Sequence, residues 1–241
     1  MSSGAPEIAA DNYRKEARLL EEELRRFGDA PPKGALATMA GLSEGIGTLC
    51  WQFGDAQASK WFERSLELYR QSTSDLTIKV ALLLWKMRDR AAFQRECEGV
   101  IEFHARRLQA TKAGQLDLPE RQLVRAYRES AFAHFLRDDY ERARECAEQA
   151  LGFGWERQTP GDMTALVHLV QGLGRGDEMA FIRGLEILRS SCQRWPTASA
   201  SVFDDLLRYG LAVGMRRFPE VTRLFEPFGN GQGHGLECPI S

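Results

Sequence analysis

The sequence predicts an all-α protein made of stacked antiparallel helix pairs, arranged as an α-solenoid or a bundle. Three observations lead to this class. Apolar residues recur through most of the chain with the 3.6-residue period of amphipathic helices. Every proline falls at a predicted helix start or in a linker, and no stretch alternates apolar and polar residues as a β-strand would. The 241 residues are also enough to bury a core without disulfide or metal staples.

The strongest pattern runs from Tyr127 to Leu151, where two helical stretches meet at the polar turn Asp138-Asp139. One face of the second helix carries small residues and the other carries charges. Small residues on an apolar face let a neighbouring helix approach closely. The stretch therefore predicts a helix pair that packs beside other pairs. Its small residues are Ala143, Ala147 and Ala150.

Periodicity, helix caps and turn residues predict the other elements. An N-terminal packing helix is expected at 7–27 and a glycine-rich helix at 35–53. C-terminal helices are expected within 197–228, followed by a flexible tail at 229–241. The remaining helices are predicted after Gly54-Asp55, from Ser74 through Trp85, after Asp89, after Pro119, after Asp139, from Pro160 to Leu173 and after Asp177, with loops at 110–118 and 152–159.

Comparison of the chain with itself indicates an internal duplication inside one domain spanning 1–241. Ala58 aligns with Ala143 at an offset of 85, and Asp89 aligns with Asp177 at an offset of 88. We therefore predict two copies of a four-helix unit, at 35–109 and 119–194. Stacking the copies would bury faces that neither copy could hide alone.

Composition limits the classes of partner. The formal net charge of −2 argues against general binding to nucleic acid or an anionic membrane, which requires a broad basic face. The five cysteines are scattered without a C-x-x-C spacing, so we expect buried free thiols in a reducing compartment. The chain lacks an apolar leader and any run long enough to span a membrane, which predicts a cytoplasmic protein of unknown oligomeric state.

The sequence offers little that resembles catalytic chemistry, so we expect no enzyme, cofactor or metal. Residues 41–45 match G-x-S-x-G around Ser43, but a nucleophile elbow needs a strand before the serine, and these surroundings are helical. Close helix packing at the glycines is the favoured interpretation. His104, His134 and His168 lie in separate helical patterns and do not form a ligand set. A helical enzyme with an unrecognised site remains a third alternative.

Partner-binding residues are sought in the loop after Gly154 and on charged helix faces. A tryptophan in a loop is either a lid over the core or an anchor for a partner, and the lid is favoured. Asp204-Asp205 is an acidic pair that helix capping or a charged surface explains better than acid–base chemistry. The candidate contacts are Trp155, Glu156, Arg157, Asp204 and Asp205.

Residues 127–151 resemble the tetratricopeptide repeat. Tyr127 stands where that family has an aromatic residue, and Ala131 where it has a small one. Ala143 and Ala150 match its small positions in the second helix, whereas Asp138 replaces its usual glycine. The resemblance covers about 25 residues and implies helix-pair stacking. It also implies an adaptor, regulator or chaperone that binds a peptide or a partner protein.

A second resemblance is to the bacterial immunity protein 49 family of polymorphic toxin systems. Residues 81–96 and 165–189 each carry an apolar helix, a short Arg/Gly/Asp turn and then Ala-Phe at the start of an amphipathic helix. This resemblance implies a bacterial protein that binds and neutralises a cognate toxin. We expect a non-catalytic protein-binding protein, most specifically an immunity protein, with the tetratricopeptide-like adaptor as the alternative.

Overall fold

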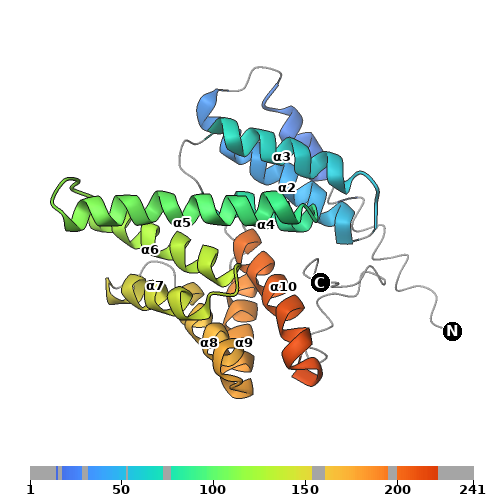
Figure 1. Ribbon diagram of the computed structural model, residues 1–241. Helices are drawn as coiled ribbons and strands as arrows, with labels where there is room; N and C mark the ends of the chain where they lie inside the picture. The colour runs from blue at the N-terminus through green and yellow to red at the C-terminus, as the bar shows by residue number, and fades with distance from the viewer. Residues whose placement is uncertain are drawn as a thin grey trace. The chain divides into compact units, whose positions relative to one another are not determined.

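The computed structural model describes Lys15 and residues 18–28, 32–52, 54–72, 77–153, 161–194 and 200–221, without the side chains at 33, 52, 192–194 and 200–204. All regular structure in this part of the chain is helical, which confirms the predicted all-α class (Figure 1). The helices form two compact units, one within Met1–Asp75 and the other within Leu76–Glu226. The division falls inside residues 35–109, which the sequence predicts to be one four-helix unit. Each unit is described by itself.

The first unit is centred on one antiparallel helix pair. It contains a helical stretch at 18–25, the 3-10 helix η1 (Lys33–Ala35), α2 (Leu36–Gln52) and α3 (Ala58–Ser72). The glycine-rich character of α2 permits close packing, since a Cβ at Gly47 would lie 2.6 Å from the ring of Phe62. Two buried hydrogen bonds join the pair: Ser65 Oγ donates to the Ala40 carbonyl at 2.9 Å, and Tyr69 donates to Glu44 at 2.8 Å.

The second unit is a series of helix pairs followed by a single helix. Each helix packs against the one that follows it in the chain. The helices are α4 (Ile78–Lys86), α5 (Arg90–Lys112), α6 (Glu120–Phe135), α7 (Tyr140–Gly152), α8 (Asp162–Arg175), α9 (Glu178–Arg194) and α10 (Ala200–Arg217).

One turn design recurs between the helices of a pair. The first helix ends at a residue whose backbone dihedral angles lie in the left-handed region. The next residue is an aspartate, and its side chain accepts a hydrogen bond from a backbone N–H at the start of the second helix. Glycine suits such a position because it lacks a Cβ, yet two of the turns use other residues there. The four turns are Gly54-Asp55 (φ 68°), Arg88-Asp89 (φ 60°), Asp138-Asp139 (φ 60°) and Gly176-Asp177 (φ 76°).

The pairs of the second unit form two layers. Besides contacts between consecutive helices, α4 contacts α6, and α6 contacts α8. We call α4, α6 and α8 the first layer, while α5, α7 and α9 form the second layer. Alternation of this kind is typical of α-solenoids, where each helix pair packs on the next. Figure 1 shows α6, α7, α8 and α9 following one another below the long helix α5.

Helix α10 crosses the carboxyl-terminal ends of the first layer. The buried ring of Tyr209 makes edge contacts with Trp85 and Phe135, at centroid distances of 5.5 Å, and lies 6.5 Å from Phe93. Its hydroxyl donates to the carbonyl of Leu136, the residue that ends α6, at 2.9 Å. This one side chain therefore contacts α4, α5 and α6.

Further along, α10 packs on the turn between α8 and α9. A Cβ at Gly214 would lie 2.2 Å from the ring of Phe181, so only a hydrogen fits between the two helices there. The ring of Phe218 lies 5.1 Å from that of Phe181. Arg217 donates to the Leu173 carbonyl near the end of α8. In this way α10 satisfies carbonyls that the ends of α6 and α8 leave without intrahelical partners.

Most predicted elements are confirmed, and the differences lie at their ends. The stripe Phe93, Cys97, Val100 and His104 is buried along α5, and Phe181, Leu185 and Leu188 are buried along α9. Helix α5 continues to Lys112, so the loop predicted from residue 110 begins too early. The predicted elements at 7–14 and 222–241 lie outside the described residues, as does most of the loop at 152–159.

The small residues of α7 provide a test of the packing. Ala143 and Ala150 are fully buried, so Ala143→Arg or Ala150→Arg would force a guanidinium into a space without room or a partner. We expect each variant to lose at least about 3 kcal/mol of unfolding free energy, measured by urea denaturation. Gln149→Arg introduces the same side chain at an exposed position of the same helix and should melt like wild type. Unfolding free energies equal to that of wild type in all three variants would refute this packing.

Candidate functional site

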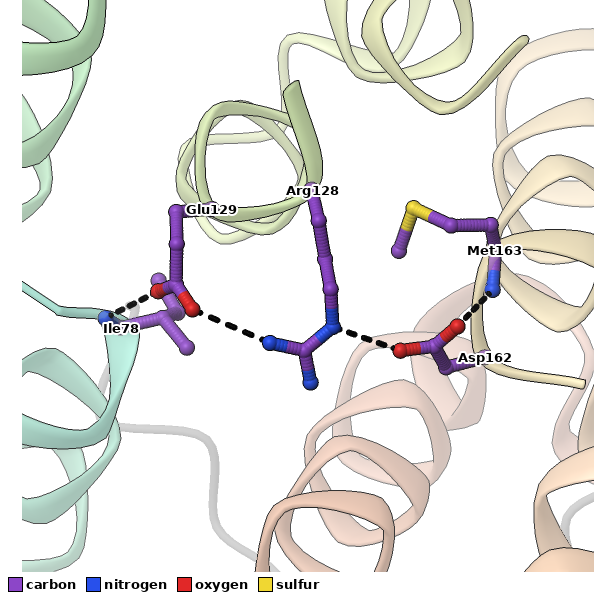
Figure 2. A network of polar contacts seen from close by, with 5 residues as sticks. All are labelled: Ile78, Arg128, Glu129, Asp162 and Met163. Carbon is purple, nitrogen blue, oxygen red and sulfur yellow. Dashed lines mark hydrogen bonds and ion pairs between the residues drawn. The ribbon is translucent and has the colours of Figure 1, made fainter. Parts of the chain in front are cut away.

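A buried polar network joins the three helices of the first layer (Figure 2). Arg128 and Glu129 are neighbours on α6, and Asp162 is the first residue of α8. Arg128 Nε donates to Asp162 Oδ2 at 2.7 Å, and Arg128 Nη1 donates to Glu129 Oε1 at 3.0 Å. Glu129 Oε2 accepts from the backbone N–H of Ile78, at the start of α4, at 2.8 Å.

The carboxylates of the network also accept hydrogen bonds from backbone N–H groups at the starts of two helices. Thr77 precedes α4 but makes no side-chain capping bond, so Glu129 reaches across from α6 to bind the N–H of Ile78. Gly161 precedes α8 and has no side chain, and Asp162 Oδ1 instead accepts from the N–H of Met163 at 2.7 Å. Carboxylates at helix amino termini are also favoured by the helix dipole.

The charges of the network are largely withdrawn from solvent. The side chain of Asp162 is 0% exposed, that of Glu129 is 6% exposed and that of Arg128 is 18% exposed. Burial alone would lower the pKa of Arg128, but the nearby Asp162 and Glu129 raise it above its ordinary value. The guanidinium also lies 5.0 Å from the centroid of the Phe132 ring. Arg128 is therefore held as a cation between two carboxylates that also cap helices, an arrangement suited to positioning α4, α6 and α8.

A second buried ion pair joins α4 to α10, and it corrects one sequence-based prediction. Lys86 Nζ lies 2.7 Å from Asp205 Oδ2, and the two side chains are 1% and 3% exposed. Asp205 is therefore an interior residue and not a surface contact for a partner. Sequence reasoning placed it on a charged surface because it follows another aspartate. Neighbours on a helix point about 100° apart, so one of them can face inward.

The other predicted partner contacts are not tested by the geometry. Trp155, Glu156 and Arg157 lie outside the described residues. Asp204 belongs to α10, but its side chain is not among those described. Sequence reasoning also missed the Arg128 network. One local feature of the sequence points to the network: the charged pair Arg128-Glu129 lies in a stretch of helix otherwise rich in alanine and aromatic residues.

Ser43 lies inside the first helix pair, where it is 0% exposed on α2. The G-x-S-x-G match is therefore part of a helix. A Cβ at either of its glycines would make only ordinary van der Waals contact, so the close packing on α2 is at Gly47 and not at these two positions. A Cβ at Gly45 would lie 3.4 Å from Leu20, and one at Gly41 would lie 3.9 Å from the Tyr69 hydroxyl. A strained strand-to-helix turn, which exposes a nucleophilic serine, is not the geometry at this position.

Cysteine and histidine side chains in the described part of the chain are dispersed. Burial raises the pKa of the Cys97 thiol to about 12 and that of Cys146 to about 11, which suits unreactive thiols. Among the described residues, no group of three or more His, Cys, Asp or Glu side chains could hold a metal ion. Within the same part of the chain, every helix is too short or too polar to cross a membrane.

Comparison of the chain with known proteins finds no significant match. No protein-family model matches the chain, and no curated sequence or solved structure matches it significantly.

The Arg128 network predicts coupled losses of stability. Asp162→Ala leaves the guanidinium with one carboxylate and removes the bond to Met163, so we expect a loss of about 3 kcal/mol in unfolding free energy. The double variant Arg128→Ala/Asp162→Ala should lose less than the sum of the two single losses, by at least about 1 kcal/mol. Urea denaturation of the four proteins measures this coupling. Asp117→Ala, at an exposed loop position, is the control, and strict additivity would contradict the prediction.

His134 predicts a pH dependence of stability. Burial lowers the pKa of His134, and the opposing effect of Asp139, whose Oδ2 lies 3.1 Å from Nδ1, does not restore it. In the unfolded chain the pKa of a histidine is about 6.5, and in the folded protein that of His134 is lower. The neutral imidazole therefore contributes stability that is fully present above the unfolded pKa. This stability is lost as the pH falls through the folded pKa, because the unfolded chain binds the proton more readily. We expect His134→Gln to reduce the decline in unfolding free energy between about pH 7 and pH 5. Identical declines in the two proteins would rule this out.

Proposed function

We propose that the chain is a non-catalytic protein-binding protein, and most specifically an immunity protein that binds and neutralises a cognate bacterial toxin in the cytoplasm. The observation that supports it is the stacking of the pairs α4/α5, α6/α7 and α8/α9 through one repeated turn. Stacked pairs form a rigid, extended surface of helix faces and turns, which is the kind of surface that helical-repeat proteins use to bind other proteins.

The chemistry of the described polar residues agrees with a binding role. The charges withdrawn from solvent in the second unit are engaged in joining helices, as in the Arg128–Asp162 and Lys86–Asp205 pairs. Most other charged side chains lie on exposed helix faces, where they can meet a partner. A partner that matches those charges would associate rapidly and specifically, because complementary charges steer encounter and penalise wrong partners.

A tetratricopeptide-like adaptor remains the alternative, supported by the alternation of the two layers. In an open stack, a partner peptide could lie along the first layer. Here α10 already crosses the carboxyl-terminal ends of α4, α6 and α8, where Tyr209 and Arg217 bind helix-end carbonyls. An adaptor built in this way would have to receive its peptide elsewhere. This favours recognition of a folded protein through the outer faces.

Co-expression with the product of the neighbouring gene tests the proposal. We expect the affinity-tagged chain to retain that protein through purification. We also expect the chain to restore the growth of cells in which expression of the neighbouring gene product inhibits growth. Gln149→Arg, which leaves the packing intact, serves as a folded control variant. Failure both to bind and to restore growth would overturn the immunity role. A hydrolase activity that disappears in Ser43→Ala would instead support an enzyme.

A further inference from the structure

Helices α5 and α6 extend beyond the short helix that precedes them. Helix α5 has 23 residues and α4 has nine, so α5 is longer by roughly 20 Å at the usual rise per residue. The amino-terminal half of α6 runs back along this extension, and Arg107 Nη2 donates to Gln122 Oε1 at 2.9 Å between the two helices. We call residues 103–125 the hairpin tip. Figure 1 shows it as the end of α5, the following loop and the start of α6.

The hairpin tip differs in charge from the rest of the chain. It contains five basic side chains and two acidic ones, a formal charge of +3, while the whole chain carries −2. The other residues therefore total −5, and the positive charge is concentrated at this end of the hairpin. The basic residues are Arg106, Arg107, Lys112, Arg121 and Arg125, and the acidic ones are Asp117 and Glu120.

The positive side chains lie at the surface and do not fill the core, and Arg106 Nη2 lies 3.8 Å from Glu102 Oε2 on the same helix. Arg106, Lys112, Arg121 and Arg125 are exposed, and Arg107 is half-buried where its guanidinium lies 5.3 Å from the Phe103 ring. The loop itself is anchored by Leu118, which is 6% exposed, while Leu116 at its apex is 37% exposed. The hairpin tip thus combines a helical base, a group of basic side chains and an exposed apolar side chain.

These features favour a protein over a nucleic acid as the occupant. Nucleic-acid binding relies on a broad basic surface that neutralises many phosphates, and this chain is acidic outside the hairpin tip. Protein interfaces combine arginine with exposed apolar anchors, as Arg121 and Leu116 do here. The charge complement of the hairpin tip is an acidic surface.

We propose that the hairpin tip is the docking surface for an acidic protein partner. The proposal rests on the protein-binding function proposed above and specifies the chemistry of the partner. Arginine contributes bidentate contacts to carboxylates, and the exposed Leu116 adds apolar contact area. The rest of the chain, being acidic, would repel such a partner and thereby direct it to this hairpin.

A charge-reversal experiment tests the proposal on the full chain. The probe is a fluorescent 20-residue poly-glutamate peptide, and binding is followed by anisotropy at low and high salt. We expect wild type to bind the peptide, with affinity falling at high salt, and Arg121→Glu/Arg125→Glu to bind at least tenfold more weakly. Arg95→Glu/Arg183→Glu makes the same change of charge at exposed positions outside the hairpin tip and should bind within about twofold of wild type.

The outcomes separate this proposal from the immunity role. Absence of peptide binding, an equal loss in both charge-reversed variants, or tighter binding of a 20-nucleotide DNA strand than of the peptide would overturn the docking surface. If the product of the neighbouring gene is retained equally by wild type and Arg121→Glu/Arg125→Glu, the docking surface is wrong and the immunity role stands. If that product is neither retained nor neutralised while the peptide results hold, the immunity role fails and the docking surface stands.

Discussion

The guanidinium of Arg128 lies between two buried carboxylates from α6 and α8, and the arrangement of the first layer depends on these contacts. Apolar side chains could fill the same volume, but their contacts have little directional preference. Ion pairs and hydrogen bonds have defined lengths and angles. Since Glu129 also binds the N–H of Ile78, one network positions the beginnings of α4 and α8 against the middle of α6.

The second constraint on this layer comes from α10, at the opposite ends of its helices. Asp205 pairs with Lys86 of α4, Tyr209 binds the end of α6 and Arg217 binds the end of α8. The layer is thus held by polar contacts at both ends, while the alanine stripe of α7 and the apolar stripes of α5 and α9 fill the space between the layers. A surface supported in this way keeps its shape, which would lower the entropy lost in binding the partner that we propose.

How far the sequence could predict this structure depended on the distance between interacting residues. Helices and turns follow from neighbours in sequence, so the stripe at Phe93 and the caps at Asp139 and Asp177 could be predicted. The network could not, because Glu129 binds a residue 51 positions earlier and Arg128 binds one 34 positions later. The same reason explains the error at Asp205, whose partner Lys86 belongs to a distant helix.

Tyr209 also bears on the order in which the second unit can be completed during synthesis. The residue that accepts its hydrogen bond lies 73 positions earlier, and its aromatic neighbour Trp85 lies earlier still. A chain emerging from the ribosome can pair α4 with α5 and α6 with α7 as soon as each is made, because those contacts are local. The ends of the first layer must wait for α10. Until then the aromatic rings that it covers, and the neighbouring helix-end carbonyls, remain open to solvent and to chaperones.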